Sequence, residues 1–511
     1  MQNNDKKVLL RISNLKQYFP LKGGRFVKAN DGITLDIYEG ETFGLVGESG
    51  CGKSTLGRTI LQLYHQTYGR TMYYGRSLDD LAPKYVIDTV KNLKARRTKL
   101  RELEQKRDKL EADYAKLSEK EQYAKHGELD TARKLAEDAL LDITKIVGGF
   151  LVVDDLDPVI AAYSKDYAIA RKLSGMEEKR QELLVDVDDA EYAKKAAEEA
   201  GKSGKDDQLQ KAQEKLKQCD DQIAALRAQL DAGRKEIEAL RAPYANDPEF
   251  QKYEAYRDDG IDLARLEYNE MRRLRRDMQL IFQDPYSSLN PRMSVGQIIS
   301  EGMQAHNMIK KKDARMQEMV LKIMDDCGLA PYFLHRFPHQ FSGGQRQRIG
   351  IARALATKPK FVVCDEAVSA LDVSIQAQII NLLLDLKEQQ NLTYMFITHD
   401  LSVVKYISDR VGVMYLGTMV ELAAADEIFH HPIHPYTEAL LNAIPTTDTV
   451  GAKELSILEG DIPSPVNPPK GCKFHTRCKY CTEICTQVVP EWEEVRPNHF
   501  VACHHKLEAK E

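Results

Sequence analysis

A glycine-rich turn between an apolar run and an amphipathic stretch is the strongest chemical signal in the sequence. Phe43–Val46 predicts a buried strand, and the turn Gly47-x-x-x-x-Gly52-Lys53-Ser54 follows it directly. Glycines there let successive backbone N–H groups face one anion, and the start of the next helix adds partial positive charge. We therefore expect a phosphate-binding loop in which Lys53 reaches the β- and γ-phosphates of a nucleotide and Ser54 binds Mg²⁺. The residues expected to hold the phosphates are Gly47, Glu48, Ser49, Gly50, Cys51, Gly52, Lys53, Ser54 and Thr55.

Two carboxylates follow a second apolar run, Phe361–Cys364. A continuous apolar strand is typical of a parallel sheet that is buried on both faces. Asp365 then stands at the carboxyl edge of the sheet, where we expect Mg²⁺, and Glu366 is suited to accept a proton from an attacking water. A third apolar run ends at His399. A lone histidine after a strand is usually structural, but in this series we interpret it as a sensor of the γ-phosphate.

Two further loops carry groups that fit a nucleotide site less specifically. An apolar strand ends at Gln283, which can bind Mg²⁺ through its carbonyl oxygen or position a water. Ser342, Gly343, Gly344 and Gln345 open an amphipathic helix, whose N-terminus suits an anion. Ser342 also suits an ordinary helix cap, and both interpretations can hold together.

The first forty residues contain an aromatic pair. Residues 7–40 alternate apolar and polar residues, which predicts antiparallel strands with turns at Gly23-Gly24 and Asp31-Gly32. Tyr18 and Phe19 lie in this region and could stack on a nucleotide base. An ordinary aromatic in a strand explains the spacing equally well.

Composition excludes some classes of protein. The net charge is −5 over 511 residues, so there is no overall basic field for nucleic acid. No apolar run reaches the 18–20 or so residues that a membrane span needs, and the N-terminus lacks the apolar core of a signal peptide. We expect a cytosolic protein whose membrane role, if any, comes through partners. Nine cysteines, five of them between 472 and 503, favour a metal over disulfides in a reducing compartment.

Residues 81–263 differ in composition from the rest, being rich in Lys, Glu, Ala, Asp and Leu. From 209 to 240 a heptad repeat places apolar residues at nearly every seam position, which predicts a coiled coil about 48 Å long. We expect this stretch to pair with residues 93–117 as one antiparallel hairpin, with residues 147–153 as a small strand or cap between them. A solvated spacer and an arm that docks a partner explain this region equally well.

In chain order, these residues resemble an ABC-type ATPase. The series is Gly47–Ser54, Gln283, Phe341–Gln345, Asp365-Glu366, Ser369–Asp372 and His399. Residues 282–293 and 369–378, His434–Thr437 and the cysteine-rich C-terminal segment further resemble ATP-binding subunits of the oligopeptide/dipeptide/nickel importer family, of the F type. The resemblance covers about 1–80 and 264–508.

The resemblance implies an α/β fold, with a RecA-like phosphate-loop core, an antiparallel β subdomain and a helical subdomain that holds the signature Ser342–Gln345. It implies a dimer around two ATP molecules, each between one subunit's phosphate loop and the other's signature, with Asp372 also at the nucleotide site. The partners implied are a related ATPase subunit, two permeases at whose cytoplasmic face the pair sits, and an extracellular binding protein. Phe19 matches the aromatic that stacks on the base, and Gln283 matches the link to the permease.

The C-terminal cysteines match a metal-binding pattern of some family members. The resemblance singles out Cys472, Cys478, Cys485 and Cys503 as ligands of an iron–sulfur cluster, with zinc as the alternative. Cys481 is an additional cysteine. The nearby histidines that could replace a ligand are His475, His504 and His505.

We therefore predict four parts. Residues 1–80 and 264–430 form the ATPase core, residues 81–263 are an insertion in it, and residues 431–511 are a C-terminal extension. The expected function is the ATP-hydrolysing motor of a peptide importer. A nickel or other small-solute importer is the alternative, because such an ATPase does not touch its cargo. A DNA-associated ATPase is disfavoured by the place of the insertion before Gln283 and by the acidic charge, and a translation-type protein by the single phosphate loop.

Overall fold

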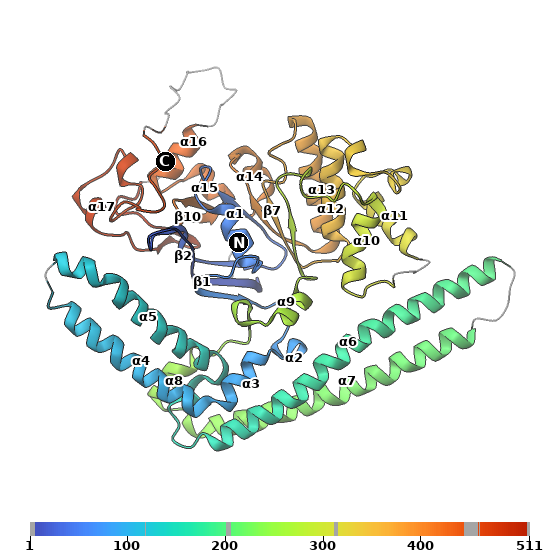
Figure 1. Ribbon diagram of the computed structural model, residues 1–511, viewed down its shortest axis with the longest axis horizontal. Helices are drawn as coiled ribbons and strands as arrows, with labels where there is room; N and C mark the ends of the chain where they lie inside the picture. Colours follow the sequence, from blue (N-terminus) through green and yellow to red (C-terminus); the bar gives the residue numbers. More distant parts are fainter. Residues whose placement is uncertain are drawn as a thin grey trace. The chain divides into compact units, whose positions relative to one another are not determined.

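The chain divides into two compact units in the computed structural model, which describes residues 6–117, 119–200, 206–310, 315–443, 458 and 460–507. One unit is Met1–Gly75 with Arg272–Glu511, and the other is Arg76–Met271 (Figure 1). No helix in these ranges is long and apolar enough to cross a membrane.

The first unit is built on a mixed sheet with the strand order β11-β12-β10-β9-β3-β8-β7-β6. Its parallel part comprises β3 (Thr42–Val46), β6 (Met278–Ile281), β7 (Phe361–Asp365), β8 (Thr393–Ile397) and β9 (Arg410–Tyr415). Strands β10 (Thr418–Ala424), β12 (His499–Val501) and β11 (Glu493–Arg496) add antiparallel neighbours. Every residue of β3, β7, β8 and β9 is buried, as expected for apolar runs in a parallel sheet.

The parallel order explains why the predicted site residues meet. Strand β3 lies between β8 and β9, and β7 lies between β8 and β6. Because carboxyl ends of parallel strands share one edge, the segments that follow β3, β6, β7 and β8 all emerge on that edge. Helices α1 (Lys53–Ile60) and α14 (Leu401–Ile407) follow β3 and β8 and pack on the sheet.

A second, antiparallel sheet takes strands from both sides of the phosphate loop in the chain. Strand β1 (Val8–Pro20) pairs with β2 (Phe26–Tyr38) and with β4 (Tyr68–Tyr73). This confirms the expected strands and the turn at Gly23-Gly24, where both glycines have positive φ. The expected turn at Asp31-Gly32 is wrong. Gly32, with φ of 84°, lies inside β2 beside shifts in the pairing register, so the glycine serves a β-bulge rather than a chain reversal.

A layer of helices packs against β6, β7 and β8. Its helices are α10 (Val295–Ala305), α11 (Met316–Asp326), α12 (Gly343–Leu355) and α13 (Val373–Gln390). They share one apolar core with β6, β7 and β8, in which Ile299, Met324, Ile349 and Leu383 are fully buried. Short helical turns η5 (Pro331–Phe333) and η6 (Pro338–Gln340) lead into α12.

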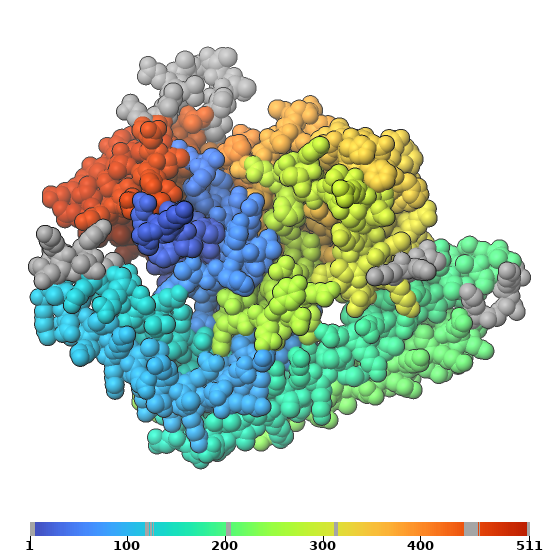
Figure 2. Space-filling view, viewed as in Figure 1, coloured from blue at the N-terminus to red at the C-terminus, as the bar shows by residue number. Residues whose placement is uncertain are grey.

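The end of the chain packs beside the N-terminal strands within the same unit. Its elements are α15 (Ala425–His430), α16 (Pro435–Asn442), η7 (His475–Arg477) and α17 (Glu483–Gln487). The backbone N–H of Lys28 donates to the carbonyl of Pro465, and the Lys473 ammonium lies 3.0 Å from an Asp31 oxygen. Figure 2 shows this red segment against the blue N-terminal residues.

The second unit is helical. Its elements are α2 (Leu78–Leu81), α3 (Lys84–Lys91), α4 (Leu93–Tyr114), α5 (Glu119–Val147), η2 (Gly148–Val152), α6 (Asp157–Glu199), α7 (Asp206–Arg241), η3 (Ala242–Tyr244), α8 (Pro248–Glu254), β5 (Ile261–Asp262) and η4 (Leu263–Arg265), and α9 (Tyr268–Leu274) leads out of it. The predicted heptad stretch forms α7, whose seam residues Cys219, Ile223, Leu230 and Ile237 are buried.

The predicted partner of the heptad stretch is wrong. Helix α7 packs along α6, and α4 packs along α5, so there are two hairpins rather than one (Figure 1). The repeat defines an apolar seam but does not encode which helix covers it. Gly233 marks a close approach of α6 to α7, since a Cβ there would lie 2.6 Å from an Asp166 oxygen. Residues 148–152 form a 3₁₀ turn between α5 and α6, so a connecting cap is present and a strand is not.

Candidate functional site

The phosphate loop joins β3 to α1 through residues whose backbone only glycine adopts easily. Gly47, Gly50 and Gly52 have φ of 149°, 78° and 103°. A Cβ on Gly47 would lie 2.2 Å from the Met414 carbonyl oxygen, and one on Gly52 would lie 2.1 Å from the Ala29 carbonyl oxygen. Both positions therefore require glycine for space as well as for φ.

The Lys53 side chain folds back over this loop. Its ammonium donates to the carbonyl oxygens of Gly47 at 2.7 Å and Glu48 at 3.0 Å, and the residue is 4% exposed. The backbone carbonyls of the loop thus hold the Lys53 ammonium in place. The same ammonium offers a positive charge to an anion that enters the loop.

Asp365 joins the end of β7 to helix α1. The Ser54 hydroxyl donates to Asp365 Oδ1 at 2.5 Å, and Arg58 Nη2 donates to Asp365 Oδ2 at 3.1 Å. The carboxylate is buried, with both oxygens paired. The sequence predicted Ser54 and Asp365 but missed Arg58. Its position one helical turn after Ser54 puts both on one face of α1, which is the signal that would have found it.

Glu366 lies between the two other residues expected to act in hydrolysis. Gln283 Nε2 donates to Glu366 Oε2 at 2.6 Å, and His399 Nδ1 lies 3.5 Å from Glu366 Oε1. Glu366 has φ of 48°, a conformation that is strained for a residue with a side chain. The structure therefore brings together three predicted residues from the ends of β6, β7 and β8. A carboxylate held between an amide and an imidazole can accept a proton from water.

The predicted signature opens α12. The Ser342 hydroxyl accepts from the Gln345 N–H at 3.3 Å, and Gln345 Oε1 accepts from the Ser342 N–H at 3.1 Å. Asp372 caps α13 in the same way, accepting from the Ile375 N–H. A Cβ on Gly344 would lie 2.5 Å from Ile375, so this glycine allows α12 and α13 to pack closely. The capping interpretation is confirmed for Ser342, and Asp372, for which no cap was predicted, is also a helix N-cap.

The predicted base-stacking aromatic lies at the end of β1. The Phe19 ring meets the Tyr64 ring edge to face, with centroids 5.3 Å apart. The neighbouring Tyr18 donates its hydroxyl proton to Asp31 at 2.5 Å. Of these two aromatic residues, Phe19 packs its ring near the end of α1, whereas Tyr18 is held by a hydrogen bond.

The four cysteines singled out in the sequence are neighbours. The backbone N–H of Cys472 donates to the Cys485 carbonyl at 2.8 Å. Burial, and to a smaller extent the charges of the neighbouring cysteines, raise the pKa of Cys503 to about 12 and that of Cys472 to about 11. Four thiols are the donor set of a zinc or iron–sulfur site. As arranged, however, no group of three or more His, Cys, Asp or Glu side chains in the described residues is placed to hold a metal ion.

The three histidines considered as substitute ligands have other partners. Their ring nitrogens lie within hydrogen-bond distance of the Cys472 carbonyl, the Val488 carbonyl and the Thr482 hydroxyl, for His475, His504 and His505 respectively.

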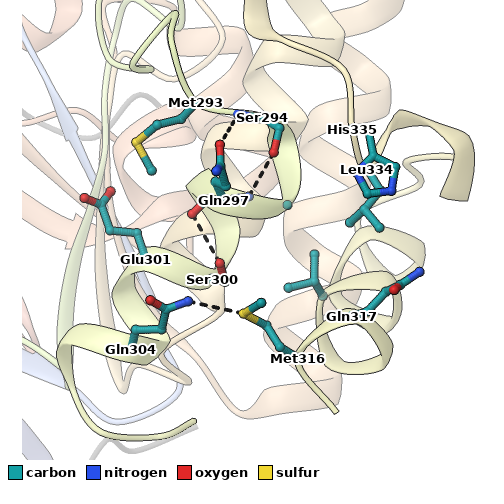
Figure 3. Close-up of a pocket in the computed structure, with 12 residues that line it drawn as sticks. Met293, Ser294, Gln297, Ser300, Glu301, Gln304, Met316, Gln317, Leu334 and His335 are labelled. Atoms are coloured by element: carbon teal, nitrogen blue, oxygen red, sulfur yellow. Dashed lines mark hydrogen bonds between the residues drawn. The ribbon is translucent and has the colours of Figure 1, made fainter. Parts of the chain in front are cut away.

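A groove of about 640 Å³ opens in the helical layer shortly after Gln283 in the chain. Helices α10 and α11 form its sides, and Leu334 and His335 close one end (Figure 3). Its lining mixes methionines and polar side chains. Gln304 donates to the Met316 sulfur at 3.2 Å across the groove, and Ser294 caps α10 at its rim.

Comparisons with known proteins agree with this geometry. Residues 30–251 and 252–369 match the family model "ABC transporter", and residues 420–485 match "Oligopeptide/dipeptide transporter, C-terminal region". The chain is 52% identical over 250 residues to "Oligopeptide transport ATP-binding protein AppF" of Bacillus subtilis, covering 48% of this chain and 75% of that protein.

A second relative matches along nearly its whole length. The chain is 34% identical over 498 residues to "Putative oligopeptide transport ATP-binding protein YkfD" of Bacillus subtilis, covering 97% of this chain and 95% of that protein. At that coverage the alignment runs through residues 76–271 as well as through the first unit.

Proposed function

The chain belongs to the ABC transporter family, among the ATP-binding subunits of peptide importers, and we propose that its ATP hydrolysis drives the uptake of short peptides. The main support for this proposal is that one chain contains both the ATPase cassette and the oligopeptide/dipeptide C-terminal region. The names of both relatives, which refer to oligopeptide transport, support peptides over nickel as the cargo.

In this proposal, the Gly47–Thr55 loop and Lys53 bind the phosphates of ATP. Ser54 and Asp365, already hydrogen-bonded to each other, would hold Mg²⁺ together with Gln283. The metal, when bound, offsets phosphate charge. Arg58 donates to the second oxygen of Asp365 and so holds this carboxylate in its orientation. Phe19 would stack on the base.

Hydrolysis would follow from the position of Glu366. Its carboxylate accepts a proton from a water whose oxygen attacks the γ-phosphorus, and the bond to the β-phosphate oxygen breaks to give ADP and phosphate. Gln283 and His399 hold the carboxylate from either side, and His399 would also contact the γ-phosphate. The hydrogen bond from Gln283 supports this assignment because it fixes the orientation of the proton acceptor.

The signature residues would act on the nucleotide of a second subunit. Ser342–Gln345 form a helix N-terminus that offers N–H groups to an anion, and Asp372 caps a neighbouring helix. A dimer around two ATP molecules would bring these groups opposite the other subunit's phosphate loop. We propose a related ATPase subunit as the partner.

The groove between α10 and α11 would receive a permease. The groove lies in the helical layer that follows the Gln283 loop in the chain (Figure 3). We propose that a permease segment bound there would shift Gln283, which donates a hydrogen bond to Glu366. The methionines Met293 and Met316 suit an apolar partner surface. In this proposal the protein would lie at the cytoplasmic face of the membrane, beneath two permeases that receive cargo from an extracellular binding protein.

We also propose that Cys472, Cys478, Cys485 and Cys503 hold a metal centre, iron–sulfur or zinc. The proximity of the four cysteines supports this proposal. Their side chains would have to move closer together to bind an ion. Metal content and visible absorbance of protein purified without oxygen test this. Replacing Cys485 by serine should lower the metal content, whereas Cys481→Ser should not; equal metal loss in both variants would contradict the assignment.

Two measurements on the full-length protein test the proposed function. Native protein should bind a fluorescent ATP analogue and Lys53→Ala should not; unchanged binding would contradict the phosphate-loop assignment. Native protein captured from detergent-treated membranes should bring two membrane-spanning permeases with it. Capture of soluble nucleic-acid-binding proteins in their place would contradict the importer assignment.

A further inference from the structure

The C-terminal extension contacts the phosphate loop directly. Arg477 binds Glu48 through two hydrogen bonds, from Nη1 to Oε2 at 2.7 Å and from Nη2 to Oε1 at 3.0 Å. Glu48 is the second residue of the Gly47–Ser54 turn. The Arg477 side chain is 5% exposed and that of Glu48 is 24% exposed, so this pair is shielded from water. A planar, bidentate pair of this kind fixes orientation as well as charge.

A second residue of the extension holds the backbone of the same loop residue. The Glu48 N–H donates to the Tyr436 hydroxyl at 2.9 Å, and Tyr436 is fully buried. Tyr436 belongs to the His434-Pro435-Tyr436-Thr437 motif, for which the ATPase chemistry above gives no role. The side chain and the backbone of Glu48 are therefore both held by residues from the end of the chain.

Aromatic rings pack around this contact. The Phe474 ring lies 5.2 Å from both the Tyr415 and Tyr436 rings and is 2% exposed. Arg477 lies over the Tyr415 ring at 6.0 Å. Nearby, Lys473 donates to the Leu416 carbonyl at 3.2 Å, and the adjacent Gly417 N–H donates to the Cys51 carbonyl at 2.9 Å. The extension thus reaches the loop at Glu48 and, through the β9–β10 turn, at Cys51.

We propose that Arg477 and Tyr436 are positioning residues for ATP, which hold Glu48 so that the phosphate loop keeps the shape that receives the phosphates. The proposal deepens, and rests on, the proposed binding of ATP by this loop. Without Arg477, an unpaired carboxylate would lie in a loop that must accept a polyanion, and the loop would lose one of its anchors. Both effects weaken nucleotide binding.

The test is the affinity of full-length variants for a fluorescent ATP analogue with Mg²⁺. Arg477→Gln should raise the dissociation constant about tenfold, and Tyr436→Phe, which keeps the ring packing, about threefold. Arg496→Gln is the matched control. Arg496 also lies in the extension, but its contact with Glu427 is long, at 3.7 Å, and exposed. This variant should bind like the native protein.

A double variant separates the charge effect from general loosening. Adding Glu48→Gln to Arg477→Gln removes the unpaired carboxylate, so part of the lost affinity should return. In steady-state hydrolysis, KM for ATP should rise in Arg477→Gln while kcat stays close to native. A defect in folding alone would lower the active fraction and kcat without this recovery.

The outcomes distinguish this inference from the proposed function. If the native protein and Arg496→Gln fail to bind the analogue, the proposed function itself fails. If they bind it and both Arg477→Gln and Tyr436→Phe bind it equally well, with normal melting curves, only the positioning role is overturned. If Arg477→Gln does not fold, the affinity of Tyr436→Phe for the analogue tests the positioning role by itself.

Discussion

The side-chain amide of Gln283 donates a 2.6 Å hydrogen bond to the carboxylate of Glu366. The two residues follow different strands, β6 and β7, and are 83 positions apart in the chain. Gln283 also begins the segment that leads into the groove between α10 and α11. A shift of this segment would therefore turn or release the carboxylate, which gives a physical route from the proposed permease contact to the rate of hydrolysis.

Replacing Glu366 by glutamine should stop hydrolysis without loss of ATP binding. The amide has the same shape but cannot accept the proton from water, so the rate should fall by a factor of about 10²–10⁴. Trapped ATP should also favour a closed dimer, visible by size-exclusion chromatography. Glu388→Gln, on the exposed side of α13, is the control and should behave as native. Native turnover by Glu366→Gln would show that another group is the base.

Replacing Gln283 by alanine should slow hydrolysis about tenfold, since a hydrogen bond to a charged acceptor is lost. The measurement is the rate of phosphate release at saturating ATP. Gln279→Ala is a matched control in β6, because the Gln279 amide donates to the nearby Arg275 carbonyl, at 2.7 Å, and not to Glu366. If both variants hydrolyse ATP at the native rate, the contact with Glu366 has no role in turnover.

The stability of the protein should fall on mild acidification, partly because of His434. Burial lowers the pKa of His434 to about 4 from a value of 6.5 when exposed. Between these values the unfolded chain binds a proton that the folded protein does not, so stability is highest above pH 6.5 and decreases toward pH 4. The full contribution of this group is about 3 kcal/mol.

His434→Asn keeps an acceptor for the Tyr436 N–H, which His434 Nδ1 now accepts at 3.0 Å, but cannot titrate. Denaturant melts of both proteins at pH 7 and pH 5 measure the difference. The native protein should lose more stability than the variant over this range. Equal losses would mean that His434 is protonated in the folded protein as readily as in the unfolded chain.

Truncating Leu230 should loosen the α6–α7 hairpin. Leu230 is 3% exposed in the seam of α7, and Leu→Ala at a buried position costs about 2–5 kcal/mol. Amide hydrogen exchange should become faster along α6 and α7, while ATP affinity stays native because α7 belongs to the other compact unit. Gln229→Ala, at an exposed neighbouring position, is the control. Faster exchange along α4 and α5 alone would contradict the pairing of α6 with α7.

The sequence predicted which candidate site residues lie close together, because their placement depends on local patterns. A buried strand followed by a polar residue fixes where the residue lies, so Lys53, Asp365 and Glu366 could be placed at one sheet edge before their contacts were known. Contacts between distant segments have no such local pattern. Arg477 meets Glu48 across 429 positions, and nothing in the spacing of either residue indicates the pair.

The helical insertion shows the same limit. The heptad repeat predicts that seam residues such as Ile223 and Leu230 are buried. Any helix with an apolar face can pack against such a seam, so the repeat does not indicate that the partner is α6 rather than α4. Gly32 illustrates a local ambiguity. A glycine after an aspartate is typical of a turn, but the same positive φ also fits a bulge inside a strand.

The central claim is that ATP hydrolysis at Glu366 drives peptide import, and its most direct test is uptake of a labelled short peptide by cells that carry either the native protein or Glu366→Gln. Nickel uptake is measured in the same cells. The account predicts that Glu366→Gln abolishes peptide uptake and leaves nickel uptake unchanged. Normal peptide uptake with Glu366→Gln would contradict it, and loss of nickel uptake alone would identify a different cargo.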